Sequence, residues 1–391
     1  PFVLALLLTL LAAALAIGLG YQGEGKDVGE RTLATMRAWG GLDGPGMWSL
    51  LAFSMQMCLV MVTGHALAES RPVARMIAAL AGLPRNGRTG AMLVSFVACG
   101  AGVVNWGLGL IVGAILAREV GRSLARRGAR FNYALLAAAG YTTMMMWHGG
   151  LSGSAPLSVT TVENAAKSLP RDVLAAHAPP SGAWIGLGET LGSNLNLVVT
   201  AGLLVIVPLV MGLLCARDEV GTLPWTIEEA DAASGSGPKE TEGGGRVPEW
   251  LETSRWPAWM LGSIAAAMLV LYVRSRGIGT VGLNEINLAM LALGLFCHGS
   301  MRGYTTAAEE GARGCVGVIL QFPLYAGIMS MMQQSGLVRM IAEGMVSVAD
   351  ERTMPLLSFV SAGVVNLFVP SGGGQWAVQG PRRRGLPSGR P

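Results

Sequence analysis

The chain has 391 residues, of which 51% are hydrophobic and only 13% are charged. That is about half the charged share of a typical soluble domain, so polar side chains cannot cover a water-facing surface. The net charge of +4 comes from arginines that lie between apolar segments, not among exposed aromatic residues, which argues against nucleic acid as a partner. The composition therefore predicts an all-α polytopic membrane protein in contact with the lipid bilayer.

An α-helix needs about 20 apolar residues to cross the hydrocarbon core. Segment 1–19 has no basic leader region and is longer than the apolar core of a signal peptide, so we predict that it is a first spanning helix. Because the chain begins without Met, we expect a short stretch to precede it. Nine stretches free of Asp, Glu, Lys and Arg are candidate membrane segments: 1–23, 44–68, 89–117, 131–162, 190–216, 256–273, 286–301, 314–338 and 353–381.

Two short basic loops, 68–88 and 117–130, set the orientation. The first carries four arginines and one acid, and the second five arginines and one acid. The positive-inside rule places both loops in the cytoplasm. The segment between them, about 90–117, must then enter and leave by the same face, and we predict a re-entrant hairpin that turns at Asn105–Gly109. The alternative is a simple spanning helix whose glycines allow close packing.

Counting outward from these loops predicts about seven transmembrane helices. Residues 215–255 are predicted to be a cytoplasmic linker, because glycine- and serine-rich runs alternate with acids there. Glu309 and Glu310 are interpreted as surface charges in a short connecting loop. The predicted crossings are 1–19, 47–67, about 131–150, about 185–214, 257–273, 286–301 and 314–333.

A polar break, Trp147–Pro156, interrupts the uncharged run 131–162. Its three glycines, two serines and one proline cannot form an ordinary helix interior. We expect this segment to unwind beside the first hairpin and to line a site with Ser152, Gly153 and Ser154; a loop at the outer surface is the alternative. His148 is a candidate for proton coupling, although a solvated histidine at a helix end is ordinary.

Two pairs of segments suggest an internal repeat. Ser95–Asn105 is echoed by Ser358–Asn366, and Gln56 by Gln321. The crossing count gives the two copies opposite orientations, which predicts an inverted repeat of the kind found in secondary transporters. The predicted parts are a first membrane repeat at 1–214 with its hairpin at about 90–117, a linker at 215–255, a second, incomplete repeat at 256–381 with its hairpin at about 354–378, and a basic tail at 382–391.

Carboxylates can be bound without arginine, because backbone N–H groups at half-helix N-termini, together with hydroxyls and amides, supply donors. Two turns offer this arrangement, and their residues are the predicted substrate contacts: Asn105, Trp106, Gly107 and Gly109 in the first hairpin, and Ser371, Gly372, Gly373, Gly374 and Gln375 in the second. The five cysteines are far apart, and no phosphate-binding loop or hydrolase pattern is present. We therefore expect no enzyme activity, cofactor or bound metal.

Several long motifs are similar to those of the short-chain fatty acid transporter family, which are bacterial inner-membrane proteins associated with uptake of acetoacetate and butyrate. The resemblance runs from about Pro1 to Pro381. It implies a secondary carrier for short-chain carboxylates. The sequence leaves open whether H⁺, Na⁺ or neither accompanies the substrate. The motifs are Leu51–Met57, Val62–Ala68, Asn105–Leu110, Gly150–Leu157, Gln321–Ile328 and Val369–Trp376.

That family is similar to a wider ion-transporter superfamily whose carriers move two opposed hairpins against a dimeric scaffold. The resemblance therefore implies an elevator-like alternating-access mechanism and a homodimer. After Pro381 the chain departs from the family pattern and becomes basic, so we expect a frameshifted or missing C-terminal part. Two other hypotheses stay open, a non-transporting membrane sensor or assembly subunit and a passive anion channel.

Overall fold

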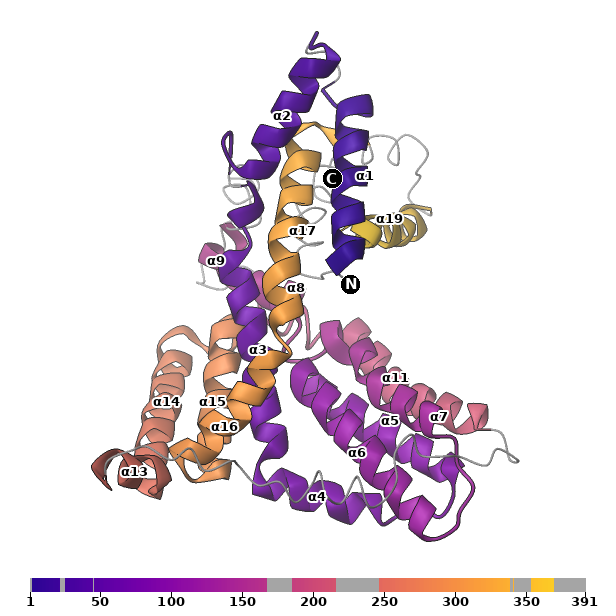
Figure 1. Cartoon of the computed structure of the whole chain (residues 1–391), viewed down its shortest axis with the longest axis vertical. Helices are drawn as coiled ribbons and strands as arrows, with labels where there is room; N and C mark the ends of the chain where they lie inside the picture. Colours follow the sequence, from indigo (N-terminus) through magenta and orange to yellow (C-terminus); the bar gives the residue numbers. More distant parts are fainter. Residues whose placement is uncertain are drawn as a thin grey trace, which may run out of the picture. The chain divides into compact units, whose positions relative to one another are not determined.

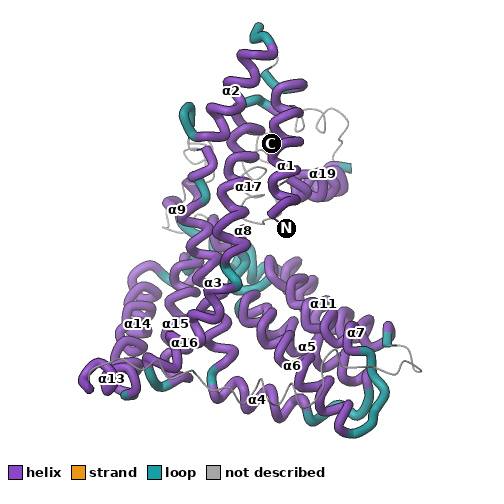
Figure 2. Tube along the Cα trace, in the orientation of Figure 1, coloured by secondary structure: helices purple, strands orange, loops and turns teal. Residues whose placement is uncertain are grey.

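The computed structural model describes residues 2–21, 25–44, 46–166, 185–215, 246–337, 340 and 353–368. In this part of the chain the elements of regular secondary structure are all helices (Figures 1 and 2). Six of the described helices are long and apolar enough to cross a membrane: Phe2–Leu19, Gly46–Glu69, Gly87–Val104, Asn194–Leu214, Arg255–Arg276 and Val316–Gln334. The prediction of an all-α polytopic membrane protein is confirmed.

The helices keep the labels of Figure 1. They are α1 (Phe2–Leu19), α2 (Val28–Gly40), α3 (Leu51–Glu69), α4 (Arg71–Ala81), α5 (Gly87–Val104), α6 (Trp106–Arg126), α7 (Tyr133–Tyr141), α8 (Ser154–Ser158), α9 (Val162–Ala166), α11 (Asn194–Leu214), α13 (Arg246–Thr253), α14 (Arg255–Arg276), α15 (Leu283–His298), α16 (Met301–Arg313), α17 (Val316–Gln334) and α19 (Met354–Phe368). Three 3-10 segments join them: η1 (Gly46–Trp48), η2 (Thr142–Gly149) and η3 (Ile278–Thr280).

The chain divides into two compact units. The first falls within Pro1–Cys58, Ser158–Trp184 and Cys315–Pro391, and α17 is its centre. Helix α17 packs against α1, α2 and η1 and buries ten of its residues, Phe322 and Leu324–Met332. Near its end, Tyr21 N–H donates to the Ser335 carbonyl at 2.8 Å, which joins the end of α1 to the end of α17.

The second unit falls within Leu59–Leu157 and Ile185–Gly314. Its largest core lies between α5, α6, α7 and α11, where Leu116, Val120, Leu124 and Leu136 are almost fully buried. A Cβ atom on Gly90 would lie 3.0 Å from Val120 Cγ1, so α5 and α6 pack in close contact. The first hairpin, one of the segments predicted to bind substrate, is part of this core.

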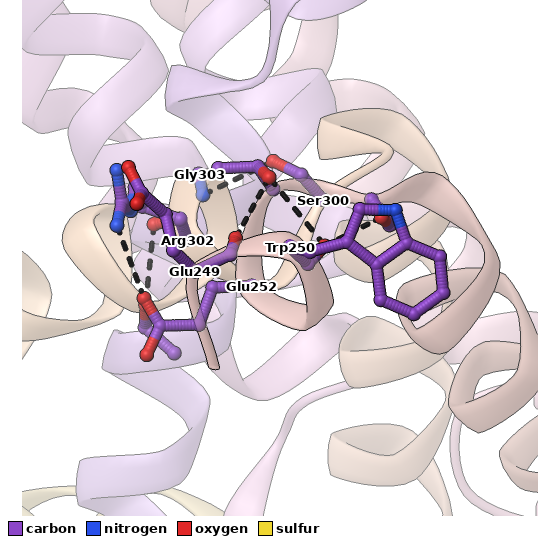
Figure 3. Close-up of polar contacts among 9 residues, drawn as sticks. Glu249, Trp250, Glu252, Ser300, Arg302 and Gly303 are labelled. Atoms are coloured by element: carbon purple, nitrogen blue, oxygen red, sulfur yellow. Dashed lines mark hydrogen bonds and ion pairs between the residues drawn. The ribbon is translucent and has the colours of Figure 1, made fainter. Parts of the chain in front are cut away.

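A smaller core in the same unit joins α14, α15 and α16 to the end of α3, through Ala66, Ala258, Leu295, Tyr304 and Ala307. Helix α13 packs beside the start of α16, where Arg302 pairs with Glu252 at 3.3 Å and Ser300 caps the helix by accepting from Gly303 N–H (Figure 3). Trp250, Trp256 and Trp259 around the start of α14 are exposed, as is common at a membrane interface.

The structure corrects several predicted boundaries. Residues 131–150 are not one helix, because α7 ends at Tyr141 and tightens into the 3-10 segment η2. The segment holding Glu309 and Glu310 is helix α16 and not a connecting loop, since Ser300 caps its start and Tyr304, Ala307 and Gly311 bury one face. The predicted crossings at 185–214 and 286–301 become α11 and α15, and the last residues of the predicted linker form α13.

Candidate functional site

The hairpin between α5 and α6 is built on a single non-helical residue. Asn105 has extended backbone angles, φ −154° and ψ 125°, and it both ends α5 and begins α6. Its side-chain oxygen accepts from Leu108 N–H at 2.9 Å, which is the N-cap interaction expected of Asn. The sequence prediction of a break at this position is confirmed, with the break one residue wide.

The two helices fold back on each other from this break (Figure 1). A Cβ on Gly109 would lie 2.7 Å from Gly102 N, and one on Gly113 would lie 3.0 Å from Ala98 Cβ, so the residues pair in antiparallel order. At the open end, Arg127 donates to the carbonyls of Gly82 and Pro84 at 2.8 and 3.2 Å. The two basic segments that flank the hairpin therefore touch each other.

The second polar break lies directly beside the first. Leu151 N–H donates to the Val103 carbonyl at 2.7 Å, and Trp106 N–H donates to Ser152 Oγ at 2.9 Å. Gly150 allows this approach, because a Cβ there would meet the Val103 carbonyl oxygen at 2.5 Å. In this structure the Trp147–Pro156 segment packs on the hairpin, as in the first of the two alternatives considered for it.

These contacts bring Asn105, Trp106 and Ser152 together, with Gly153 and Ser154 next to them. Asn105, Ser152 and Ser154 are 0% exposed and Trp106 is 6% exposed. Gly153 has no room for a side chain, since a Cβ would lie 2.9 Å from the His148 carbonyl oxygen. Gly107 faces α3, where a Cβ would lie 2.9 Å from the Val60 carbonyl oxygen.

Several buried donors at the two breaks have no hydrogen-bond partner among the described residues. They are Asn105 Nδ2, Trp106 Nε1, Trp147 Nε1 and Ser154 Oγ. Thr143 Oγ1 is also without a partner, but it is wedged against Gly102 and Gly109 inside the hairpin. An unpaired buried donor costs about 1–3 kcal/mol, so a cluster of them is a feature that a bound acceptor would relieve.

Aromatic rings cover one side of this cluster. The ring centroids of Trp106 and Trp147 lie 5.0 Å apart at an angle of 33°, and Trp147 stacks on His148 at 4.9 Å. His148 itself is exposed at the end of η2 and carries no hydrogen bond that ties it to the breaks. Its predicted role in proton coupling gains no support from this position.

One chemical expectation changes. The first-turn N–H groups of α6 were expected to bind substrate, but Trp106 N–H donates to Ser152, Leu108 N–H to the Asn105 side chain and Gly109 N–H to the Asn105 carbonyl. These three backbone donors are occupied, whereas four buried side-chain donors at the breaks have no partner among the described residues. Trp147 was not among the predicted site residues, although it lies inside the predicted polar break.

The second set of predicted contacts, Ser371 to Gln375, lies outside the described residues. Helix α19 forms the start of the predicted second hairpin. Asn366, the echo of Asn105, lies inside α19, two residues before its end, whereas Asn105 ends α5. The inverted repeat therefore stays a prediction.

Comparison with known proteins agrees with the apolar helices and with the motifs at the breaks. Residues 1–384 match the family model described as "Short chain fatty acid transporter". A protein of Escherichia coli (strain K12) named "Putative short-chain fatty acid transporter" is 37% identical over 384 residues, which are 97% of this chain and 80% of that protein. One of the same name from Haemophilus influenzae is 34% identical over 381 residues, again 97% and 80% of the two chains.

No solved structure matches the chain. The family match covers both helix breaks and all six long apolar helices. The chain therefore belongs to the short-chain fatty acid transporter family, and it is a multi-pass carrier of the bacterial inner membrane, not an enzyme.

Proposed function

We propose that the chain moves short-chain monocarboxylates, such as butyrate or acetoacetate, by alternating access, and that the carboxylate binds at the adjoining breaks of α5–α6 and η2–α8. The observation that carries the proposal is the group of buried, unpartnered donors at these breaks, Asn105 Nδ2, Trp106 Nε1, Trp147 Nε1 and Ser154 Oγ. Three of the four are N–H groups, which can only donate. A carboxylate can only accept, and its two oxygens offer about four lone-pair sites.

The absence of a charged donor suits a carrier that must also release its substrate. Arginine and lysine are not among the described residues that form the two breaks. Neutral hydrogen bonds contribute about half as much as charge-assisted ones, so the anion is recognised without being held too tightly. The indole rings of Trp106 and Trp147 add an apolar wall suited to a short acyl chain.

We propose further that the α5–α6 hairpin is re-entrant. The uncharged part of α6, Trp106 to Ala117, has about 12 residues and spans about 18 Å, short of the roughly 30 Å hydrocarbon core. The contact of Arg127 with Gly82 and Pro84 supports a common side for both basic segments. The elevator-like movement, the homodimer and the contribution of Ser371 to Gln375 belong to the same proposal and rest on sequence resemblance.

The re-entrant hairpin predicts that the two basic segments label from the same face. Arg85→Cys and Arg126→Cys replace exposed side chains on either side of the hairpin. With a membrane-impermeant maleimide, we expect neither variant to label in intact cells and both to label after permeabilisation, with the signal of the unsubstituted chain subtracted. Labelling of one variant in intact cells and not the other would mean that the segment crosses the membrane.

The carboxylate site predicts the effect of removing single donors. Trp147→Phe keeps the aromatic ring but removes the N–H, and Ser154→Ala removes the hydroxyl. Each should raise the KM for radiolabelled butyrate uptake into proteoliposomes about five- to tenfold, as expected for one lost neutral hydrogen bond.

The matched controls are Trp259→Phe and Ser275→Ala, which alter exposed residues of α14. These should leave KM unchanged after the flux through protein-free liposomes has been subtracted. Saturable uptake that also exchanges internal for external butyrate is the result expected of a carrier. If the wild-type protein shows no saturable flux, or if the site variants match their controls, the proposal fails.

A further inference from the structure

A cluster of titratable side chains lies in the second unit, where the end of α3 packs on α16. One nitrogen or oxygen atom from each of His65, Glu69 and Glu310 lies within 4.8 Å of the other two. His65 Nε2 is 3.3 Å from Glu69 Oε1. Gly311 makes the close approach of α16 possible, because a Cβ there would lie 2.9 Å from His65 Cβ.

The imidazole of His65 is largely buried beside the Glu69 carboxylate. Its side chain is 14% exposed, and its Nε2 atom is buried with no hydrogen-bond partner in the described part of the chain. The contact with Glu69 becomes an ion pair only when the ring is protonated. The negative end of the α3 dipole lies at the same place, because both residues are in its last two turns.

Both carboxylates of the cluster are exposed, and the described residues place no other cation against either of them. Within the described residues, Glu69 has only the contact with His65, and Glu310 has no ion pair with lysine or arginine. With a neutral ring the cluster carries two negative charges. Protonation of the ring reduces the net charge of the cluster from −2 to −1, and the positive ring then attracts each carboxylate.

The other helices that pack here bring few titratable groups. From α15, His298 binds the Ala66 carbonyl through Nε2 at 2.6 Å, and from α16 the Tyr304 ring meets His298 edge-on at 5.9 Å. The hairpin on the other side of α3 presents Asn105 and Leu108, which do not titrate. The charge state of the cluster is therefore set by His65, Glu69 and Glu310, with His298 as the nearest further ring among the described side chains.

The same turn of α3 contacts the proposed substrate site. A Cβ on Gly64, the residue before His65, would lie 2.6 Å from Leu108 N and 3.0 Å from Asn105 Oδ1. Helix α3 thus has the hairpin break on one side and the acidic cluster on the other. A change of charge at His65 acts on a helix turn that is packed directly against Asn105.

We propose that His65, Glu69 and Glu310 form a proton-binding site that couples proton binding to binding of the carboxylate. This inference rests on the proposed function. A proton taken up here together with a monocarboxylate cancels the substrate charge, so the loaded carrier moves with no net added charge. By reciprocity, protonation tightens substrate binding as much as substrate tightens the hold on the proton.

The test is equilibrium binding of radiolabelled butyrate to the purified full chain in detergent, at about pH 8 and about pH 6, the range in which histidine titrates. The substrate stays ionised, since aliphatic carboxyls titrate near pH 4–5. We expect the wild-type Kd to fall on acidification by about 5- to 150-fold, the usual range of coupling between two sites. In His65→Gln the Kd should be the same at both pH values, and in Glu310→Gln, which keeps the ring but removes one of its two carboxylates, the Kd should change less with pH than in the wild-type protein.

Glu309→Gln is the matched control, because Glu309 is exposed like its neighbour Glu310 but lies outside the cluster. It should keep the wild-type pH dependence. A wild-type Kd that does not change with pH, or variants that respond like the control, would overturn the proton site and leave the proposed function standing. Absence of butyrate binding by the wild-type protein at both pH values would overturn the proposed function itself.

Calorimetric titration with Zn²⁺ provides the remaining comparison, because one imidazole and two carboxylates can also bind a divalent metal. We expect no tight binding that depends on His65. The proposal would be overturned if Zn²⁺ bound tightly, if this binding were lost in both variants, and if the butyrate Kd changed with Zn²⁺ concentration and not with pH. The cluster would then be a metal site and not a proton site.

Discussion

Asn105→Asp is expected to abolish butyrate uptake while leaving the protein folded. Asp caps a helix as well as Asn does, so the bond to Leu108 N–H and the start of α6 are kept, and the helix N-terminus favours the negative charge. The substitution removes the unpartnered Nδ2 donor and places a carboxylate where the substrate carboxylate is proposed to bind. Repulsion of several kcal/mol should lower uptake at least about a hundredfold. Uptake into proteoliposomes and thermal unfolding measure the two effects separately.

The matched control for this variant is Asn132→Asp. Asn132 caps α7 in the same way, with its side-chain oxygen accepting from Leu135 N–H at 3.0 Å. It lies at the start of α7, away from the two breaks. We expect this control to transport butyrate at the wild-type rate. Normal uptake by Asn105→Asp would show that Asn105 is only a helix cap and would remove it from the substrate site.

The helix break at Asn105 could be predicted because its signals are local, an Asn followed by two glycines. That both flanking segments lie on one face of the membrane stays a prediction from the arginines. The contact between Arg127 and Pro84 agrees with that placement. The break after His148 was also recognisable, because glycine, serine and proline exclude an ordinary helix. Helix α2 also has a local signal, the Asp27–Glu30 capping box, but it was not predicted because it is not an uncharged apolar segment.

The chemistry of the site depends on long-range packing and could not be predicted in the same way. Ser152 accepts from Trp106 N–H across 46 positions of sequence, and this bond occupies a donor that the sequence assigned to the substrate. Trp147 joins the site because its ring meets Trp106, which no periodicity indicates. Glu310 is exposed, as the sequence predicted, but its closeness to His65 depends on how α16 packs on α3, which the sequence does not indicate.

Gly64→Ala is expected to destabilise the packing of α3 on the hairpin break. The new Cβ would lie 2.6 Å from Leu108 N and 3.1 Å from the Gly107 carbonyl carbon, and backbone atoms cannot rotate away as a side chain can. Overpacking of this kind costs about 1–3 kcal/mol. We expect a lower unfolding temperature and loss of butyrate uptake, because the added atom pushes the hairpin break away from α3.

Gly100→Ala provides the comparison within the hairpin, since a Cβ at Gly100 of α5 has nothing within 4 Å. Alanine is favoured over glycine inside a helix by about 1 kcal/mol, so this variant should unfold at the same or a higher temperature and should transport normally. Equal behaviour of the two variants would mean that α3 does not pack on the break at Asn105. The link from the substrate site to His65 would then be lost, because it rests on the contact of Gly64, the residue before His65, with Asn105 and Leu108.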